Sequence, residues 1–193
     1  MQKFKKILKI SSILLSIILT LILVFLIYWY ITTFHAYKKD IDLGIKGSKL
    51  ELGEDISQIY KLSTIAYKKH QLLSLGTRSI FLKFRHNHNN HKHSGQALNK
   101  ALWKISIDFW YSEKEIFYIW AKYYYFYGAE GLNDSAMKIF SKRFSDLTLK
   151  EQATILVKGY GGKYKSRTKI FDEKVDEVVK KYIHIYGEKL TSE

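Results

Sequence analysis

The sequence has no cysteine and no proline among its 193 residues. Without cysteine, neither a disulfide framework nor a thiolate metal site can form. The absence of proline accompanies heavy use of Lys, Ile and Tyr, a bias that an AT-rich genome is enough to produce, so it excludes no fold. The length of the chain allows one domain together with a membrane anchor.

Acidic residues are missing from a long central window. No Asp or Glu occurs between Ile56 and Ile107, although Lys, Arg and His are frequent there. This window therefore supplies no carboxylate that could act as a catalytic base. The formal charge of the whole chain is +14, which favours an anionic partner such as phospholipid, a polyprenyl phosphate or an acidic protein, with nucleic acid ranked below these.

The stretch HNHNNHKH, from His86 to His93, contains no apolar residue and is typical of a solvated loop. Imidazoles are also common ligands for zinc, copper and nickel. However, no carboxylate or thiol lies nearby in the sequence, and such close spacing fixes no coordination geometry. We therefore assign no metal ligand and expect no cofactor.

The first 35 residues carry the signals of a membrane anchor. The run from Ile10 to Phe34 has no charged residue and exceeds the roughly 20 residues that span a bilayer core. Tyr28, Trp29 and Tyr30 lie near its far end, where an aromatic belt is expected. Because no small-residue cleavage site follows, we predict an uncleaved, single-pass helix. The lysines before it favour a cytoplasmic N-terminus; they are Lys3, Lys5, Lys6 and Lys9.

The sequence predicts that the chain has three parts. Residues 1–35 form a basic tip and anchor, residues 36–54 a polar connector with a short strand near Lys49–Leu52, and residues 55–193 a mainly helical domain. The domain is expected to be helical because its apolar residues recur at intervals of three and four.

Helices of this domain are predicted to begin at Asp55 and Ser94, and a last helix to run from Phe171 to Tyr186. The expected inward face of the second contains Ala97, Leu98, Ala101, Leu102 and Ile105. The expected inward face of the last contains Val175, Val178, Val179, Tyr182 and Ile183.

The segment from Tyr111 to Leu156 is predicted to form three short helices. Ser112 with Glu115 and Thr148 with Glu151 have the spacing of capping boxes. Between them, two glycines mark a break. The residues expected to cap the helix after this break are Asn133 or Asp134.

This segment resembles the peptidoglycan glycosyltransferases of family 51, the transglycosylase domain of penicillin-binding proteins and monofunctional transglycosylases. YSEKEI, YFYGAEGL and FSKRFSDLTLKEQA follow in the order, and nearly the spacing, of the family's motifs. Upstream, Gln96 and Lys100 match places in its S-T-I-T-Q-Q-L-A-K-N-L segment. The resemblance covers roughly residues 55 to 160 and implies a small lysozyme-like domain. It also implies the bacterial inner (plasma) membrane, with the domain on the extracytoplasmic side.

The resemblance is degenerate where the family carries its catalytic acids. The family's general base is the Glu of E-D-x-x-F-x-x-H, which takes a proton from the attacking sugar hydroxyl. With Tyr67 and His70 in the F-x-x-H places, Ser63 stands where this Glu should be. A second register places Lys68 and Lys69 over the acidic pair. The second Glu, of an R-K-x-x-E segment, has no counterpart.

Four residues remain as site candidates. His70 is a candidate because histidine side chains commonly act as general acids and bases near neutral pH, although a lone histidine is more often structural or solvated. Lys100 and Lys104, one helical turn apart, are able to bind a phosphate or pyrophosphate together, although a solvated basic face has the same pattern. With Gln96, these lysines are our predicted substrate-binding residues.

We therefore expect a membrane-anchored, glycosyltransferase-like protein that is not an active enzyme. It would bind a lipid-linked glycan, or hold partner proteins of cell-wall synthesis. One alternative is a divergent, active peptidoglycan glycosyltransferase with another base. A second alternative is a basic membrane protein that binds anionic phospholipid or nucleic acid.

Overall fold

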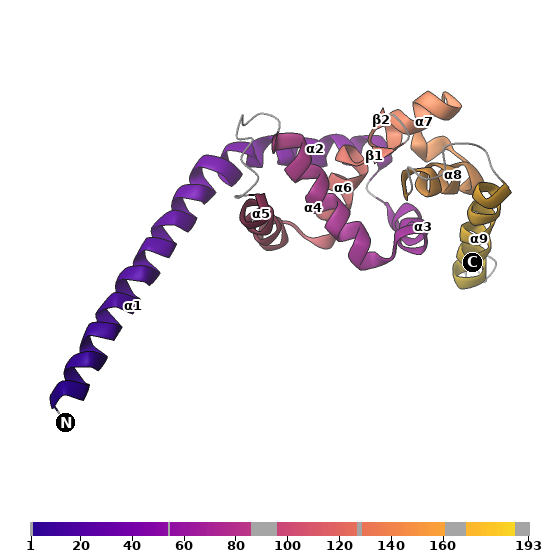
Figure 1. Ribbon diagram of the computed structural model, residues 1–193. Helices are drawn as coiled ribbons and strands as arrows, with labels where there is room; N and C mark the ends of the chain where they lie inside the picture. Colours follow the sequence, from indigo (N-terminus) through magenta and orange to yellow (C-terminus); the bar gives the residue numbers. More distant parts are fainter. Residues whose placement is uncertain (1, 54, 86–95, 127–128, 161–168, 188–193) are drawn as a thin grey trace. The chain divides into compact units, whose positions relative to one another are not determined.

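The computed structural model describes residues 2–53, 55–85, 96–126, 129–160 and 169–187. The chain divides into two compact units, Met1–Asp40 and Ile41–Glu193. Helices dominate both units (Figure 1), which confirms the predicted mainly helical fold class.

The first unit consists mainly of one long apolar helix. Helix α1 (Gln2–Trp29) has 28 residues, which corresponds to about 42 Å at the α-helical rise. It continues into a π-helical stretch, η1 (Tyr30–His35), and then into α2 (Ala36–Leu52). An apolar window in this stretch has a mean hydropathy of 3.0. By length and composition, the helix is able to cross a membrane, in agreement with the predicted anchor.

Helix α2 replaces the polar connector and the strand that we expected over residues 36–54, so the strand prediction was wrong. Ile41, Ile45 and Leu52 lie at helical spacing and are buried, which stabilises a helix despite its glycines. The helix ends at Gly53, whose φ of +84° suits a glycine after a helix C-terminus. Its amide donates to the carbonyl of Lys49 over 2.9 Å.

The second unit adds eight helical elements and one hairpin among its described residues. They are α3 (Ser57–Tyr67), α4 (Lys69–Arg85), α5 (Gln96–Trp110), α6 (Glu113–Tyr123), β1 (Tyr125–Phe126), β2 (Ala129–Glu130), α7 (Leu132–Phe140), the 3-10 helix η3 (Phe144–Asp146), α8 (Leu149–Tyr160) and α9 (Lys169–Tyr186). Helix α6 packs along α4, while α3, α8 and α9 pack on one another.

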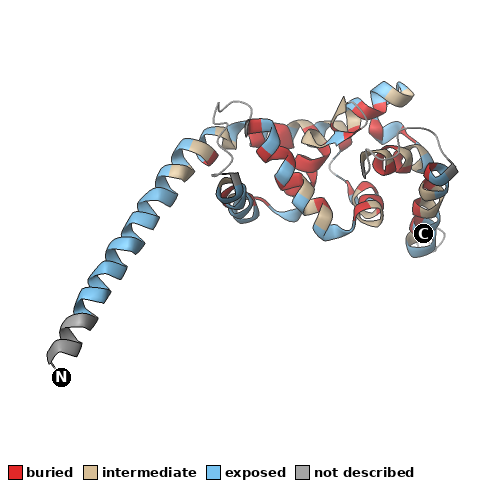
Figure 2. Ribbon diagram, viewed as in Figure 1, coloured by how far each residue is buried: buried red, intermediate tan, exposed pale blue. Residues whose placement is uncertain are grey.

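Helix α6 lies at the centre of this unit's core. All its residues from Ile116 to Ala121 are buried, and Figure 2 shows buried residues concentrated on α4 and α6. The ring of Trp120 lies 5.4 Å from that of Tyr67 and 5.2 Å from that of Phe126, measured between centroids. Aromatic packing across α3, α6 and β1 therefore fixes where the chain leaves α6.

The three helices predicted between Tyr111 and Leu156 are present as α6, α7 and α8. Both capping boxes are confirmed, since Ser112 and Glu115 bind each other's backbone, as do Thr148 and Glu151. The predicted cap of α7 was wrong. That helix begins directly after Gly131, without a side-chain cap. The Asn133 side chain instead accepts from the amide of Phe144 over 3.2 Å.

The helices predicted outside this segment are also present, with different bounds or faces. Helix α3 begins at Ser57 because the Asp55 carboxylate accepts from the Ser57 amide over 3.0 Å. That hydrogen bond is the main cause that lowers the pKa of Asp55. In α9, Val175, Val178 and Tyr182 are buried as predicted, but Ile183 is exposed.

The predicted inward face of α5 was wrong. Leu102 is buried as expected, but Leu98 and Ile105 are exposed. The residues that enter the core are instead Trp103 and Ile107. Trp103 stacks on Phe84 of α4, with ring centroids 6.3 Å apart.

Candidate functional site

Adjoining cavities follow the exposed side of α4, and we call them together the α4 groove. Its first cavity, of about 400 Å³, is lined by His70 and Ser74 among others. A second, of about 310 Å³, shares these two residues and adds Leu75 and Tyr124. A third, of about 500 Å³, shares Leu75 and Tyr124 and extends to Arg78 and beyond. The shared residues indicate one elongated surface rather than separate sites.

The sequence of α4 explains why one side of this helix is open to solvent and can line the groove. His70, Ser74 and Arg78 follow at intervals of four, which places them on one face of a helix, and all three are exposed. The opposite side is held against α6. There, Gly76 allows close packing, because an added Cβ would lie 3.0 Å from the carbonyl oxygen of Ile116.

The first cavity brings together two of the predicted site residues, His70 and Lys104, with two carboxylates that sequence reasoning did not place there. Asp108 and Glu113 line the same cavity. Asp108 forms an ion pair with Lys104, and Glu113 lies 2.8 Å from the ammonium of Lys69.

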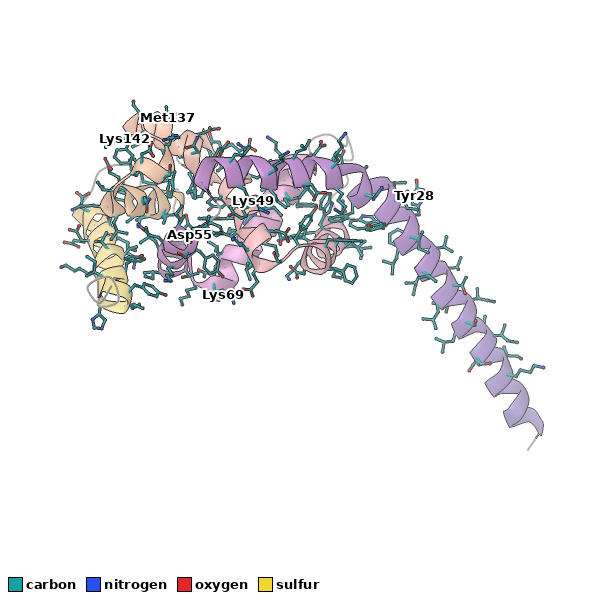
Figure 3. The ribbon with its side chains drawn as sticks, turned by 180° about the vertical axis from the view of Figure 1, so that it is seen from behind. Tyr28, Lys49, Asp55, Lys69, Met137 and Lys142 are labelled. Atoms are coloured by element: carbon teal, nitrogen blue, oxygen red, sulfur yellow. The ribbon has the colours of Figure 1, made fainter. Side chains whose placement is uncertain are left out.

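The two ion pairs limit what this cavity can do chemically. The hydrogen bond and charge of Glu113 raise the pKa of Lys69, whose place at the start of α4 is marked in Figure 3. Each carboxylate is thus matched by a lysine. His70 has no ion pair with any described residue, and it is exposed to solvent.

The third cavity has an aromatic wall and two cationic groups. Tyr123, Tyr124 and Tyr125 line it where α6 passes into β1. Lys83 on α4 binds both oxygens of Glu130, over 2.7 and 2.8 Å. The charge of Lys83 is therefore balanced within the cavity.

Arg78 differs from Lys83 in having no carboxylate partner within the described part of the chain. Its guanidinium acts on Tyr124, whose pKa is raised by burial and lowered to a smaller extent by Arg78. The Tyr124 hydroxyl donates to the carbonyl of Gly159 over 3.0 Å. A fixed positive charge beside tyrosine rings can bind a phosphate bidentately while the rings contact an apolar sugar face.

The remaining predicted residues are placed as follows. Lys100 is exposed on α5, one turn before Lys104. The side chain of Gln96 and the stretch His86–His93 lie outside the described residues. Within the described residues, no group of three or more His, Asp or Glu side chains is arranged to hold a metal ion.

The positions that the resemblance to family 51 assigns to the catalytic base carry no acid in either register. Ser63 is fully buried, and its hydroxyl has no hydrogen-bond partner in the described structure. Lys68 and Lys69 are exposed. A buried hydroxyl without an acceptor cannot take a proton from a substrate.

No protein-family model matches the chain, and no match is found among curated proteins or solved structures. The resemblance to family 51 glycosyltransferases therefore stays a prediction.

Proposed function

We propose that the protein is a membrane-anchored, non-catalytic binder of a lipid-linked glycan. In this proposal, α1 spans a bacterial inner membrane, and the helical domain is a lysozyme-like relative of family 51 glycosyltransferases on the extracytoplasmic side. The single observation that carries the proposal is that Arg78, which has no carboxylate partner among the described residues, lies beside the tyrosine wall of the α4 groove.

The shape and chemistry of the groove suit a long, polar and anionic ligand. A diphosphate linkage offers oxygens to Arg78, and sugar rings offer apolar faces to Tyr124 and Tyr125. The groove extends from these residues to His70 and Lys104, which leaves room for more than one sugar. Ser63 stands where the resemblance places the catalytic Glu, which supports binding of the glycan without its polymerisation.

Binding of a polyprenyl-diphosphate-linked disaccharide to the full chain in detergent tests this function. Arg78→Ala should weaken binding about 10- to 100-fold, because a hydrogen-bonded charge contributes about 1.5–3 kcal/mol. Lys180→Ala, at an exposed lysine of α9, is the matched control and should bind as the wild type does. Equal affinities for all three proteins would refute the groove as the binding site.

The divergent enzyme is the second candidate, because His70 lies in the same cavity as Asp108 and Glu113. It requires polymerisation of the lipid-linked disaccharide by the purified chain, lost in His70→Ala. We expect no polymer from either protein. Polymer from the wild type alone would overturn the non-catalytic function.

The other alternative is a basic membrane protein that binds nucleic acid. Strongly salt-dependent DNA binding without glycan binding would favour it over both glycan-related functions.

A further inference from the structure

Tyr123, at the end of α6, lines the third cavity of the α4 groove and contacts both α4 and α2. Its ring packs edge to face on Phe84 of α4, with centroids 6.1 Å apart. The ammonium of Lys83 lies over the same ring, 5.8 Å from its centroid. The hydroxyl end of the ring lies against the backbone of α2 at Gly44, where an added Cβ would be 2.1 Å from the hydroxyl oxygen. The position of this lining ring therefore depends on the residue at position 44.

Hydrogen bonds from two other tyrosines hold α2 in place on either side of Gly44. The hydroxyl of Tyr111 donates to the carboxylate of Asp42 over 2.9 Å. The hydroxyl of Tyr118 donates to the carbonyl oxygen of Gly53 over 3.1 Å. Moving α2 away from the ring of Tyr123 would strain or break these bonds, so the helix gives way less readily than the ring does.

A side chain at position 44 would displace the ring of Tyr123. The three atoms nearest to an added Cβ are the hydroxyl oxygen, Cζ and Cε2 of this ring, at 2.1, 2.6 and 2.7 Å. All three belong to the far end of a side chain, which moves at a smaller cost than backbone. Phe84 is buried and blocks movement into the core, whereas the third cavity, of about 500 Å³, is open. The displaced ring would therefore enter the cavity.

We propose that Gly44 is a positioning residue of the glycan site, because its lack of a side chain lets the ring of Tyr123 lie against α2 and keeps the third cavity open for a sugar. This inference rests on the proposed function, in which the diphosphate binds Arg78 and the sugar contacts Tyr124 and Tyr125. The volume of the cavity lies within the usual range of small-molecule sites. Gly44 thus controls the space for the sugar, while Arg78 binds the charge of the ligand.

Two ligands that differ only in the sugar test this assignment on the full chain in detergent. One is the polyprenyl-diphosphate-linked disaccharide, and the other is the same polyprenyl diphosphate without sugar. Gly44→Ala should weaken binding of the first about tenfold or more, the effect of overfilling a packed site, and leave binding of the second unchanged. The melting temperature should change little, because alanine also favours the helix. Gly47→Ala, where nothing lies within 4 Å of an added Cβ, is the matched control and should bind both ligands as the wild type does.

Shortening the side chain at position 123 tests whether the effect passes through the ring. Tyr123→Leu lacks the three atoms that approach position 44, so adding Gly44→Ala to it should weaken binding of the disaccharide ligand no further. A general effect of the methyl group on α2 would persist in the double variant. Equal losses from Gly44→Ala in both backgrounds, or equal losses for the ligands with and without sugar, would overturn the proposal.

A ligand-free measurement separates this inference from the proposed function. Fluorotyrosine placed at position 123 alone should show a shifted fluorine NMR signal in Gly44→Ala and the wild-type signal in Gly47→Ala. An unshifted signal in Gly44→Ala overturns the proposal even where glycan binds. If Arg78→Ala weakens binding of both ligands and Gly44→Ala of neither, the inference fails and the proposed function stands. A wild type that binds no glycan refutes the proposed function and the sugar site with it, and the fluorine signal still decides whether Gly44 positions Tyr123.

Discussion

Trp120→Ala is expected to lower the free energy of unfolding by about 3–5 kcal/mol, the usual range for removing a buried tryptophan. Trp120 is fully buried in α6. Its ring contacts Tyr67 and Phe126 edge to face and stacks on Tyr124 at 6.0 Å. The cavity left by alanine would be lined by rigid aromatic rings, which cannot close it without moving the elements that carry them.

Trp120→Phe is the matched control for this prediction. The indole Nε1 of Trp120 has no hydrogen-bond acceptor in the described structure, so phenylalanine loses no hydrogen bond and retains an aromatic ring. For the full chain in detergent, near-ultraviolet circular dichroism should show the alanine variant melting roughly 6–20 °C lower. The phenylalanine variant should lose less than half of that. An alanine variant that melts with the wild type would contradict the central place of Trp120.

This prediction also concerns the α4 groove. Helix α6 ends three residues after Trp120, and the chain then supplies Tyr124 and Tyr125 to the groove wall. Trp120→Ala removes the packing beneath Tyr124. The variant molecules that still fold should therefore bind the glycan more weakly than the wild type does. The same core residues that stabilise the domain thus position its candidate site.

Local signals in the sequence predicted a large part of the helical fold. The capping boxes at Ser112 and Thr148 have reciprocal partners three residues on, so neighbouring residues alone determine where α6 and α8 begin. The apolar run in α1 needs no tertiary information either, because its length and composition are sufficient. Such features depend on residues within one turn of each other or on composition.

Features that depend on tertiary packing were missed. In α2 the glycines and charges suggested a connector, whereas burial of Ile41 and Ile45 favours the helix. In α5 apolar residues occupy two faces, so periodicity alone could not show which one enters the core. The stacking of Trp103 on Phe84 of α4 determines which face of α5 enters the core.

Of the residues predicted from the sequence, His70 lines the first two cavities of the α4 groove and Lys104 lines the first, whereas the described lining of the third contains none of them. His70 and Lys104 were each chosen from the sequence, and the packing of α4 against α5 brings them to one cavity. Arg78 was not chosen, although its spacing of eight from His70 places both on one side of a helix. Its tyrosine neighbours belong to a segment more than forty residues later, and only the folded chain shows them together.

Gly131→Ala is the other substitution with a large expected effect, about 2–5 kcal/mol of lost stability. Gly131 has a φ of +88°, which side chains rarely adopt. A Cβ there would lie 2.7 Å from the carbonyl oxygen of Lys122 and 3.1 Å from that of Ala121. Both contacts are to the backbone of α6, so relief requires that the helix end or the hairpin moves.

Gly47→Ala separates this strain from the general effect of adding a methyl group. Gly47 lies within α2, and nothing is within 4 Å of the position of an added Cβ. Alanine there should leave the melting temperature unchanged or raise the stability by up to about 1 kcal/mol. Equal melting temperatures for the two alanine variants would show that the backbone at Gly131 is not strained.

The position of Gly131 connects this strain to the groove. Its amide donates to the carbonyl of Tyr124 over 2.8 Å, and the adjoining hairpin pairs Tyr125 with Glu130. A displaced hairpin would move Glu130 from Lys83, so glycan binding should weaken even at temperatures where Gly131→Ala is still folded. Lys83→Ala leaves the backbone in place and should weaken binding less. The reverse order would mean that the lysine, rather than the hairpin geometry, determines the affinity of the third cavity.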